Sequence, residues 1–83
     1  MRYYHYKKYK SLIEEALPLL STIVFRHWRF DVKVSIVDDL HDIDEIAIDV
    51  DTEERHEHEA TDLVQAFLDG FILARCPEYK ARL

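Results

Sequence analysis

Histidine and carboxylate side chains are concentrated in residues 41–59, HDIDEIAIDVDTEERHEHE, a segment with three histidines and nine carboxylates. Imidazole and carboxylate groups together bind zinc or manganese when three or four of them converge on one point. His56 and His58 are two residues apart, so they diverge on a helix and converge only on an extended chain. His41 and Asp42 would have to complete the site, and the sequence has neither His-x3-His nor Cys-x2-Cys spacing. A metal-dependent hydrolase or nuclease is therefore an alternative, and the favoured interpretation has no metal and no cofactor.

Covalent catalysis finds no support in the spacing of the other reactive residues. Cys76 is the single cysteine, and no histidine pattern marks a base that would activate it. One glycine, Gly70, cannot build a glycine-rich phosphate loop. We therefore predict a protein that is not an enzyme. A single cysteine also excludes an intramolecular disulfide, which is typical of a reducing compartment and predicts a cytoplasmic protein.

Charge is distributed unevenly along the 83 residues, whose net charge is −6. Residues 38–62 carry twelve acidic side chains and one basic side chain, whereas residues 1–37 carry seven basic and three acidic ones. Such a segment repels nucleic acid and attracts basic surfaces. In size and charge the chain resembles immunity proteins, antitoxins and phage-encoded inhibitors, a resemblance of composition that no motif accompanies.

The acidic segment predicts binding to a basic protein by charge mimicry, in which carboxylates occupy a surface made for phosphates. The competing interpretation is that the acidic surface only keeps the protein soluble. The residues expected to contact the partner are Asp38, Asp39, Asp42, Asp44, Glu45, Asp49, Asp51, Glu53, Glu54, Glu57 and Glu59.

Aromatic and basic residues alternate in the N-terminal segment RYYHYKKYK, residues 2–10. Single-strand binding proteins use this combination, because bases stack on rings and lysines meet phosphates. The alternative function is thus a nucleic-acid-binding module that uses Tyr3, Tyr4, Lys7, Lys8 and Lys10. The competing interpretation makes Tyr6 and Tyr9 the start of a helix's inner face, and the nearby carboxylates favour it.

A first helix is predicted from apolar residues at three- and four-residue spacing: Ile13, Ala16, Leu17, Leu20, Ile23, Val24 and His27. Pro18 lies on the polar side and removes one backbone hydrogen bond, so a kinked helix and two consecutive helices are both consistent with the sequence. Because Thr22, Ile23 and Val24 are β-branched, an extra strand at residues 22–28 is an alternative.

Two strands follow, in which Phe30, Val32, Val34 and Ile36 and then Ile46, Ile48 and Val50 alternate with polar residues. Pairing Ile36 with Ile46 and Val34 with Ile48 keeps the apolar side chains on one face. This register places Lys33 opposite Asp49 and makes residues 38–44 the loop. A second helix should begin at an N-cap, Asp51 or Thr52, and end before Pro77. Its apolar face is Leu63, Val64, Phe67, Leu68, Phe71 and Ile72.

These elements predict an α+β fold, a small two-layer helix-strand-strand-helix domain that comprises residues 1–83 and contains an antiparallel hairpin. No apolar run approaches the length of about 20 residues that spans a bilayer, so we expect no membrane association. The helices are apolar over wide faces that a two-stranded sheet cannot cover, which predicts a homodimer. Phe67, Gly70, Phe71 and Leu73 are the expected interface, because Asp49 and Asp51 would repel their copies if the strand edges paired.

Overall fold

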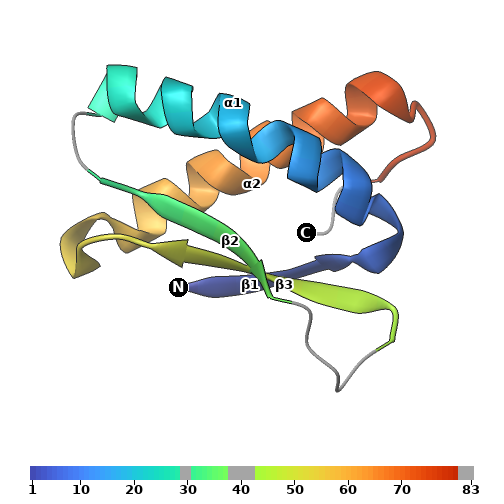
Figure 1. Cartoon of the computed structure of the whole chain (residues 1–83), viewed down its shortest axis with the longest axis horizontal. Coiled ribbons are helices and arrows are strands. Elements are labelled where there is room, and N and C mark those ends of the chain that lie inside the picture. Colours follow the sequence, from blue (N-terminus) through green and yellow to red (C-terminus); the bar gives the residue numbers. More distant parts are fainter. Residues whose placement is uncertain (29–30, 38–42, 81–83) are drawn as a thin grey trace.

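The described part of the chain forms three strands and two long helices, with a short 3-10 turn before each helix (Figure 1). The structure, a computed structural model, describes residues 1–28, 31–37 and 43–80, and describes only the backbone of residues 21–28. In chain order the elements are β1 (Arg2–Tyr6), η1 (Lys7–Tyr9), α1 (Lys10–Trp28), β2 (Lys33–Val37), β3 (Glu45–Asp51), η2 (Glu54–His56) and α2 (Glu57–Arg75).

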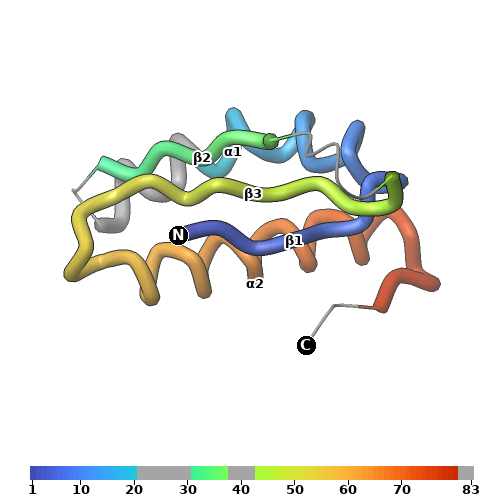
Figure 2. Tube along the Cα trace, turned by 90° about the horizontal axis from the view of Figure 1, so that it is seen from below, coloured from blue at the N-terminus to red at the C-terminus, as the bar shows by residue number. Residues whose placement is uncertain are grey.

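The three strands form one antiparallel sheet in the order β1-β3-β2, so β3 is the central strand. Both helices cover the same face of this sheet, with α1 behind β2 and α2 behind β1 (Figure 2). We call the covered face the inner face and the opposite one the outer face. The predicted α+β class is confirmed. The alternative strand at residues 22–28 is wrong, because α1 continues as one helix through Pro18 to Trp28.

The strand that was not predicted from the sequence is β1, which lies where the sequence suggested the start of a helix. Tyr3 and His5 face inward, whereas Arg2, Tyr4 and Tyr6 lie on the outer face. This is the alternation of a half-buried strand. Its inward side chains are a tyrosine and a histidine rather than aliphatic residues, so the pattern lacked the usual apolar signal.

The hairpin of β2 and β3 forms as predicted between Val37 and Glu45, but its register differs from the predicted one. Val34 pairs with Val50 and Ile36 with Ile48, a shift of two residues that places Lys33 opposite Asp51. A two-residue shift leaves every side chain on the same face, so the apolar pattern cannot distinguish the two registers.

The second helix begins later than predicted, because β3 continues to Asp51 and η2 precedes α2. Neither Asp51 nor Thr52 is its N-cap. The Thr52 hydroxyl instead donates a hydrogen bond of 2.7 Å to the Asp31 carbonyl, which joins the end of β3 to the segment before β2. The helix ends at Arg75, two residues before Pro77, as predicted.

A single core lies between the inner face and the helices. The central strand contributes Ile46, Ile48 and Val50, all fully buried. The predicted helix faces are confirmed where their side chains are described: Ile13, Ala16, Leu20, Val64, Leu68 and Ile72 are buried, and Leu17, Leu63, Phe67 and Phe71 pack against them. The predicted inward residues Ile23, Val24 and His27 lie outside the described side chains. Within the described part of the chain, neither helix is long and apolar enough to cross a membrane.

Leu68→Ala should lower the free energy of unfolding by about 2–5 kcal/mol, because Leu68 is fully buried and the truncation leaves a cavity. Leu19→Ala is the matched control, since Leu19 is 53% exposed, and its cost should stay below about 1 kcal/mol. Urea unfolding followed by circular dichroism measures both. Equal losses in the two variants would contradict the position of the core.

Candidate functional site

The structure divides the carboxylates predicted to bind a partner between different parts of the molecule. Asp38, Asp39 and Asp42 lie outside the described residues. Asp44 and Glu45 stand at the start of β3, where the Asp44 carbonyl accepts a hydrogen bond from the Lys7 amide. Asp49, Asp51, Glu53, Glu54, Glu57 and Glu59 follow along β3, η2 and the first turn of α2. The described members of the set therefore lie at both ends of β3 and not at one place.

At the end of the sheet where β3 ends and β2 begins, Asp31, Asp51 and Glu53 line one surface hollow, and Glu54 and Glu57 follow in η2 and at the start of α2. We call this the acidic end and define it as Asp31, Asp51, Glu53, Glu54 and Glu57. These residues belong to three segments that the fold brings together: the approach to β2, the end of β3, and η2 with the start of α2. Sequence analysis did not include Asp31, because it lies outside the acidic segment.

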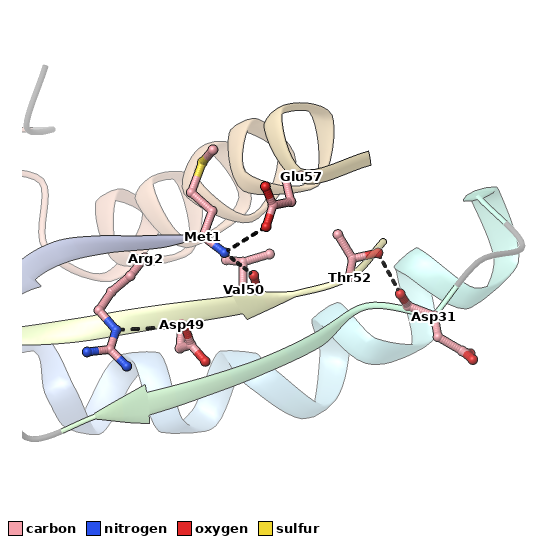
Figure 3. A network of polar contacts seen from close by, with 7 residues as sticks. All are labelled: Met1, Arg2, Asp31, Asp49, Val50, Thr52 and Glu57. Carbon is pink, nitrogen blue, oxygen red and sulfur yellow. Dashed lines mark hydrogen bonds and ion pairs between the residues drawn. The ribbon is translucent and has the colours of Figure 1, made fainter. Parts of the chain in front are cut away.

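Three polar contacts hold the acidic end in place (Figure 3). The hydrogen bond from Thr52 to the Asp31 carbonyl fixes the approach to β2 against the end of β3. The terminal amine of Met1 lies 2.8 Å from the Val50 carbonyl oxygen and 3.5 Å from Glu57 Oε1, so it links β3 to α2. The carboxylates are thus carried by a hydrogen-bonded frame rather than by a loop alone.

The Met1 ammonium pairs with Glu57, and the side-chain cations described at the acidic end are Lys33 and Arg55. They line a shallow surface hollow together with Asp31, Asp51, Thr52 and Glu53. Arg55 Nε is 2.9 Å from Glu53 Oε2, an exposed ion pair, and Lys33 stands opposite Asp51 in the sheet. Exposed pairs of this kind contribute little stability. Among the described residues, the five carboxylates outnumber the two side-chain cations and the Met1 ammonium, so these groups together give the acidic end a negative potential.

The proposed metal ligands are not brought together as far as the structure describes them. Among the described side chains, those of residues 1–20, 31–37 and 43–80, there is no group of three histidine, cysteine, aspartate or glutamate residues arranged to hold a metal ion. His56 lies in η2 and His58 in the first turn of α2. His41 and Asp42, which would have to complete the site, are outside the described residues.

A buried chain of hydrogen bonds, which sequence analysis missed, links β1 to α2 and the C-terminal segment. The Tyr6 amide donates to His5 Nδ1 at 2.9 Å, so the neutral imidazole carries its proton on Nε2. His5 Nε2 lies 3.1 Å from the Tyr79 hydroxyl, which in turn donates to Asp69 Oδ1 at 2.6 Å. Each donor therefore has an acceptor. The His5 and Tyr79 rings are also nearly parallel, with centroids 5.9 Å apart.

The hydroxyls of Tyr79 and Tyr3, in or near these hydrogen bonds, are held in their protonated form. Burial, then the hydrogen bond to Asp69 and the charge of Asp69, raise the pKa of Tyr79 well above its ordinary value. Burial, together with the Asp69 charge, likewise raises the pKa of Tyr3, whose buried hydroxyl has no hydrogen-bond partner among the described residues. His5 and Tyr79 are 74 residues apart in the sequence, so no local pattern could have predicted their contact.

The outer face of the sheet exposes two of the N-terminal tyrosines. Tyr4 is 48% exposed and Tyr6 is 38% exposed, and they stand two residues apart on β1. The Lys8 ammonium lies 5.7 Å from the centre of the Tyr6 ring and 5.1 Å from that of Tyr9. Tyr3, in contrast, faces the core, so the candidate nucleic-acid residues are divided between the two faces of the sheet.

The predicted dimer residues lie on α2, but they differ in exposure. Gly70 is exposed with open space around it, and Leu73 is 50% exposed. Phe67 and Phe71 pack partly against the core, and the Arg75 guanidinium stacks 3.6 Å from the centre of the Phe71 ring. Leu73 is therefore the large apolar side chain of this set that is most available to a partner.

The fold and the acidic end define a small two-layer α+β domain with one open sheet face and a negatively charged end. Comparison with known proteins found no matching family model, no similar curated protein and no similar solved structure. The interpretation of function therefore rests on the geometry of this chain.

Stability should decrease as the pH rises above about 10, because the unfolded chain releases tyrosine protons there while Tyr79 and Tyr3 keep theirs in the fold. The contribution of these hydroxyls is fully present below that pH. Tyr79→Phe should lose about 1–3 kcal/mol at neutral pH, because it leaves Asp69 and His5 without their partner, and should show a shallower alkaline decline. Urea unfolding from pH 7 upward measures both effects.

Tyr4→Phe is the control, since it removes an exposed hydroxyl and should change neutral-pH stability by no more than about 0.5 kcal/mol. If Tyr79→Phe were as stable as the unmodified chain, the buried hydrogen-bond chain would not contribute to the fold.

Proposed function

We propose that the protein is a non-enzymatic binding protein whose acidic end contacts a basic surface of another protein, and that it inhibits or regulates that protein by charge mimicry. The observation that supports this is that Asp31, Asp51 and Glu53 line one surface hollow beside a hydrogen-bonded frame, with Glu54 and Glu57 close after them in the sequence. A basic groove that accepts phosphates would accept carboxylates held at fixed positions, and the complementary charge would speed association.

The frame matters because binding through ordered carboxylates costs less conformational entropy than binding through a flexible acidic tail. Thr52 and the Met1 amine fix the strand and helix ends that carry the acidic residues. The competing interpretation, a surface that only confers solubility, requires no particular arrangement of charge. The two interpretations therefore differ in whether the position of the carboxylates matters or only their number.

A pair of charge-matched variants tests this difference. The first carries Asp31→Asn, Asp51→Asn, Glu53→Gln and Glu54→Gln at the acidic end. The second carries Glu14→Gln, Glu15→Gln, Asp62→Asn and Glu78→Gln, which are exposed positions elsewhere. Both lose the same charge, so the proposal predicts that only the first loses the proteins that the unmodified chain captures from a lysate.

Capture should also weaken between low salt and about 0.15 M ionic strength, where the Debye length is about 8 Å. Mass spectrometry of the captured proteins and circular dichroism of each variant accompany the measurement. If both variants lose capture equally, total charge is responsible. Capture that neither salt nor the first variant reduces would overturn charge mimicry.

We propose further that the protein is a homodimer. Large apolar side chains remain half exposed on both helices, Leu19 on α1 and Leu73 on α2. The sheet also has two edges, β1 and β2, at which antiparallel strands can be extended. The predicted surface of Phe67, Gly70, Phe71 and Leu73 is one way to join two copies, and a sheet edge is the other.

A second candidate function is binding of single-stranded nucleic acid at the outer face. Its support is the exposure of Tyr4 and Tyr6 on an open sheet, with Lys8 beside Tyr6. Exposed aromatic side chains on a sheet are stacking surfaces for unpaired bases, and nearby cations contact the phosphates. The net charge of −6 opposes this function and places it second.

Fluorescence anisotropy with labelled single-stranded oligonucleotides at low salt tests the second candidate. Replacing Tyr4 and Tyr6 with alanine should weaken binding about fivefold or more, because each stacked base contributes about 1–3 kcal/mol. Phenylalanine at both positions retains the rings and should retain binding. The absence of binding by the unmodified chain at low salt would dismiss the nucleic-acid function.

A further inference from the structure

The two edges of the sheet are not the strands that the sequence suggested. Because β3 is central, its carboxylate Asp49 lies between Arg2 of β1 and Ser35 of β2, and Asp51 lies opposite Lys33 of β2. The charge repulsion that argued against pairing between sheet edges therefore does not arise from β3. The edges are β1 and β2, and β2 (Lys33–Val37) contains no carboxylate.

The direction of the free backbone groups on β2 follows from the hydrogen bonds of β3. The Val50 amide donates to the Met1 carbonyl, and the Val50 carbonyl oxygen accepts from the Met1 amine, so both groups of Val50 point toward β1. Val50 and Val34 are therefore a non-hydrogen-bonded pair. By the alternation of an antiparallel ladder, the N–H and C=O groups of Val34 and Ile36 point away from β3 to the free edge.

At the edge of β1, by contrast, one of the outward backbone groups already has a hydrogen-bond partner. The same alternation directs the backbone groups of Arg2, Tyr4 and Tyr6 outward, but the Tyr6 amide donates to the His5 imidazole. On β2, none of the described residues forms a hydrogen bond with the outward groups of Val34 or Ile36. Lys33, at the first position of the strand, is its one charged residue, and the strand has no proline and no inward-pointing charge to prevent pairing at this edge.

Apolar burial decreases toward this edge. Val50 and Ile48 of β3 are completely buried, whereas Val34 and Ile36, their partners on β2, are only partly buried although they also face the helices. A strand added beside β2 would cover the exposed part of both side chains and would extend the ladder.

We propose that β2 pairs antiparallel with β2 of a second copy, with the two-fold axis at Ser35. This register places Val34 of each copy opposite Ile36 of the other, where their outward N–H and C=O groups form four hydrogen bonds. The two copies then share a six-stranded sheet with all helices on one face. The inference rests on the proposed homodimer and specifies its surface.

A second copy fits this edge because the strand is complementary to itself. Around the two-fold axis the apolar side chains face each other on the inner side, and Ser35 meets Ser35 on the outer side. Lys33 lies opposite Val37 of the other copy, so no like charges are opposed within the paired strands. Copies of a chain with a net charge of −6 repel each other, and a strand with one lysine and no carboxylate is a favourable place for them to meet.

The variant Ser35→Lys distinguishes the edge from the rest of the surface. Within one copy the new lysine stands opposite Asp49, so the fold is retained. Across the proposed two-fold axis, two lysines oppose each other, and the dimer dissociation constant should rise at least about tenfold. Sedimentation equilibrium over a wide range of protein concentration measures it, and Leu73→Asp on α2 is the matched control that should leave the dimer intact.

Cross-linking tests the register in a Cys76→Ser background. Ser35→Cys should form a disulfide between copies on oxidation, because non-hydrogen-bonded partners bring their Cβ atoms close together. Lys33→Cys should not, since the two copies of residue 33 would be four residues apart along the strands, about 13 Å. Cross-linking of both variants, or of neither, would overturn the register.

Three outcomes separate this inference from the homodimer itself. Dissociation by Ser35→Lys but not by Leu73→Asp supports the β2 edge. The reverse result assigns the dimer to α2 and overturns the edge while leaving the homodimer. A monomer at every concentration overturns both, and leaves the free edge to an extended peptide of another protein.

Discussion

The central position of β3 is the constraint on which the rest of the structure depends. Its inward residues Ile46, Ile48 and Val50 are fully buried beneath both helices, and burial of aliphatic side chains is the main stabilising contribution in a domain of this size. Its backbone is hydrogen-bonded on both sides, to β1 and β2. Because β3 is central, its outer carboxylates Asp49 and Asp51 lie beside cations of two neighbouring strands, Asp49 beside Arg2 of β1 and Asp51 beside Lys33 of β2. The two edge strands, β1 and β2, carry no carboxylate.

The buried polar chain of His5, Tyr79 and Asp69 explains how a short N-terminal strand stays attached to that centre. A buried imidazole is costly unless both ring nitrogens have partners, and here the Tyr6 amide and the Tyr79 hydroxyl supply them. The same hydroxyl secures the segment after α2 through Asp69. One set of hydrogen bonds thus joins β1 to α2 and to the segment that follows it, and its directional geometry specifies the position of β1 in a way that apolar packing alone would not.

Periodicity in the sequence was sufficient to predict the helices and the hairpin, and insufficient wherever the decisive contact was distant. Leu68 and Ile72 could be assigned to the core because helical spacing is a local property. The register of β2 on β3 could not be predicted from the sequence, since a two-residue shift leaves every side chain on the same face. The position of β1 depends on Tyr79, and the convergence of Asp31 with Asp51 depends on the hairpin, so the acidic end was only partly predictable from the acidic segment.

Edge pairing and the acidic end are compatible in their geometry. The acidic end lies where β2 begins, and antiparallel pairing places the beginning of one β2 beside the end of the other. The acidic ends of two copies would therefore stand at opposite ends of the shared sheet, where their mutual repulsion is weakest. A dimer of this form presents two separate negative surfaces instead of one, so a partner with two basic sites could bind both copies at once. The second contact would then be intramolecular and would gain affinity without any new interaction.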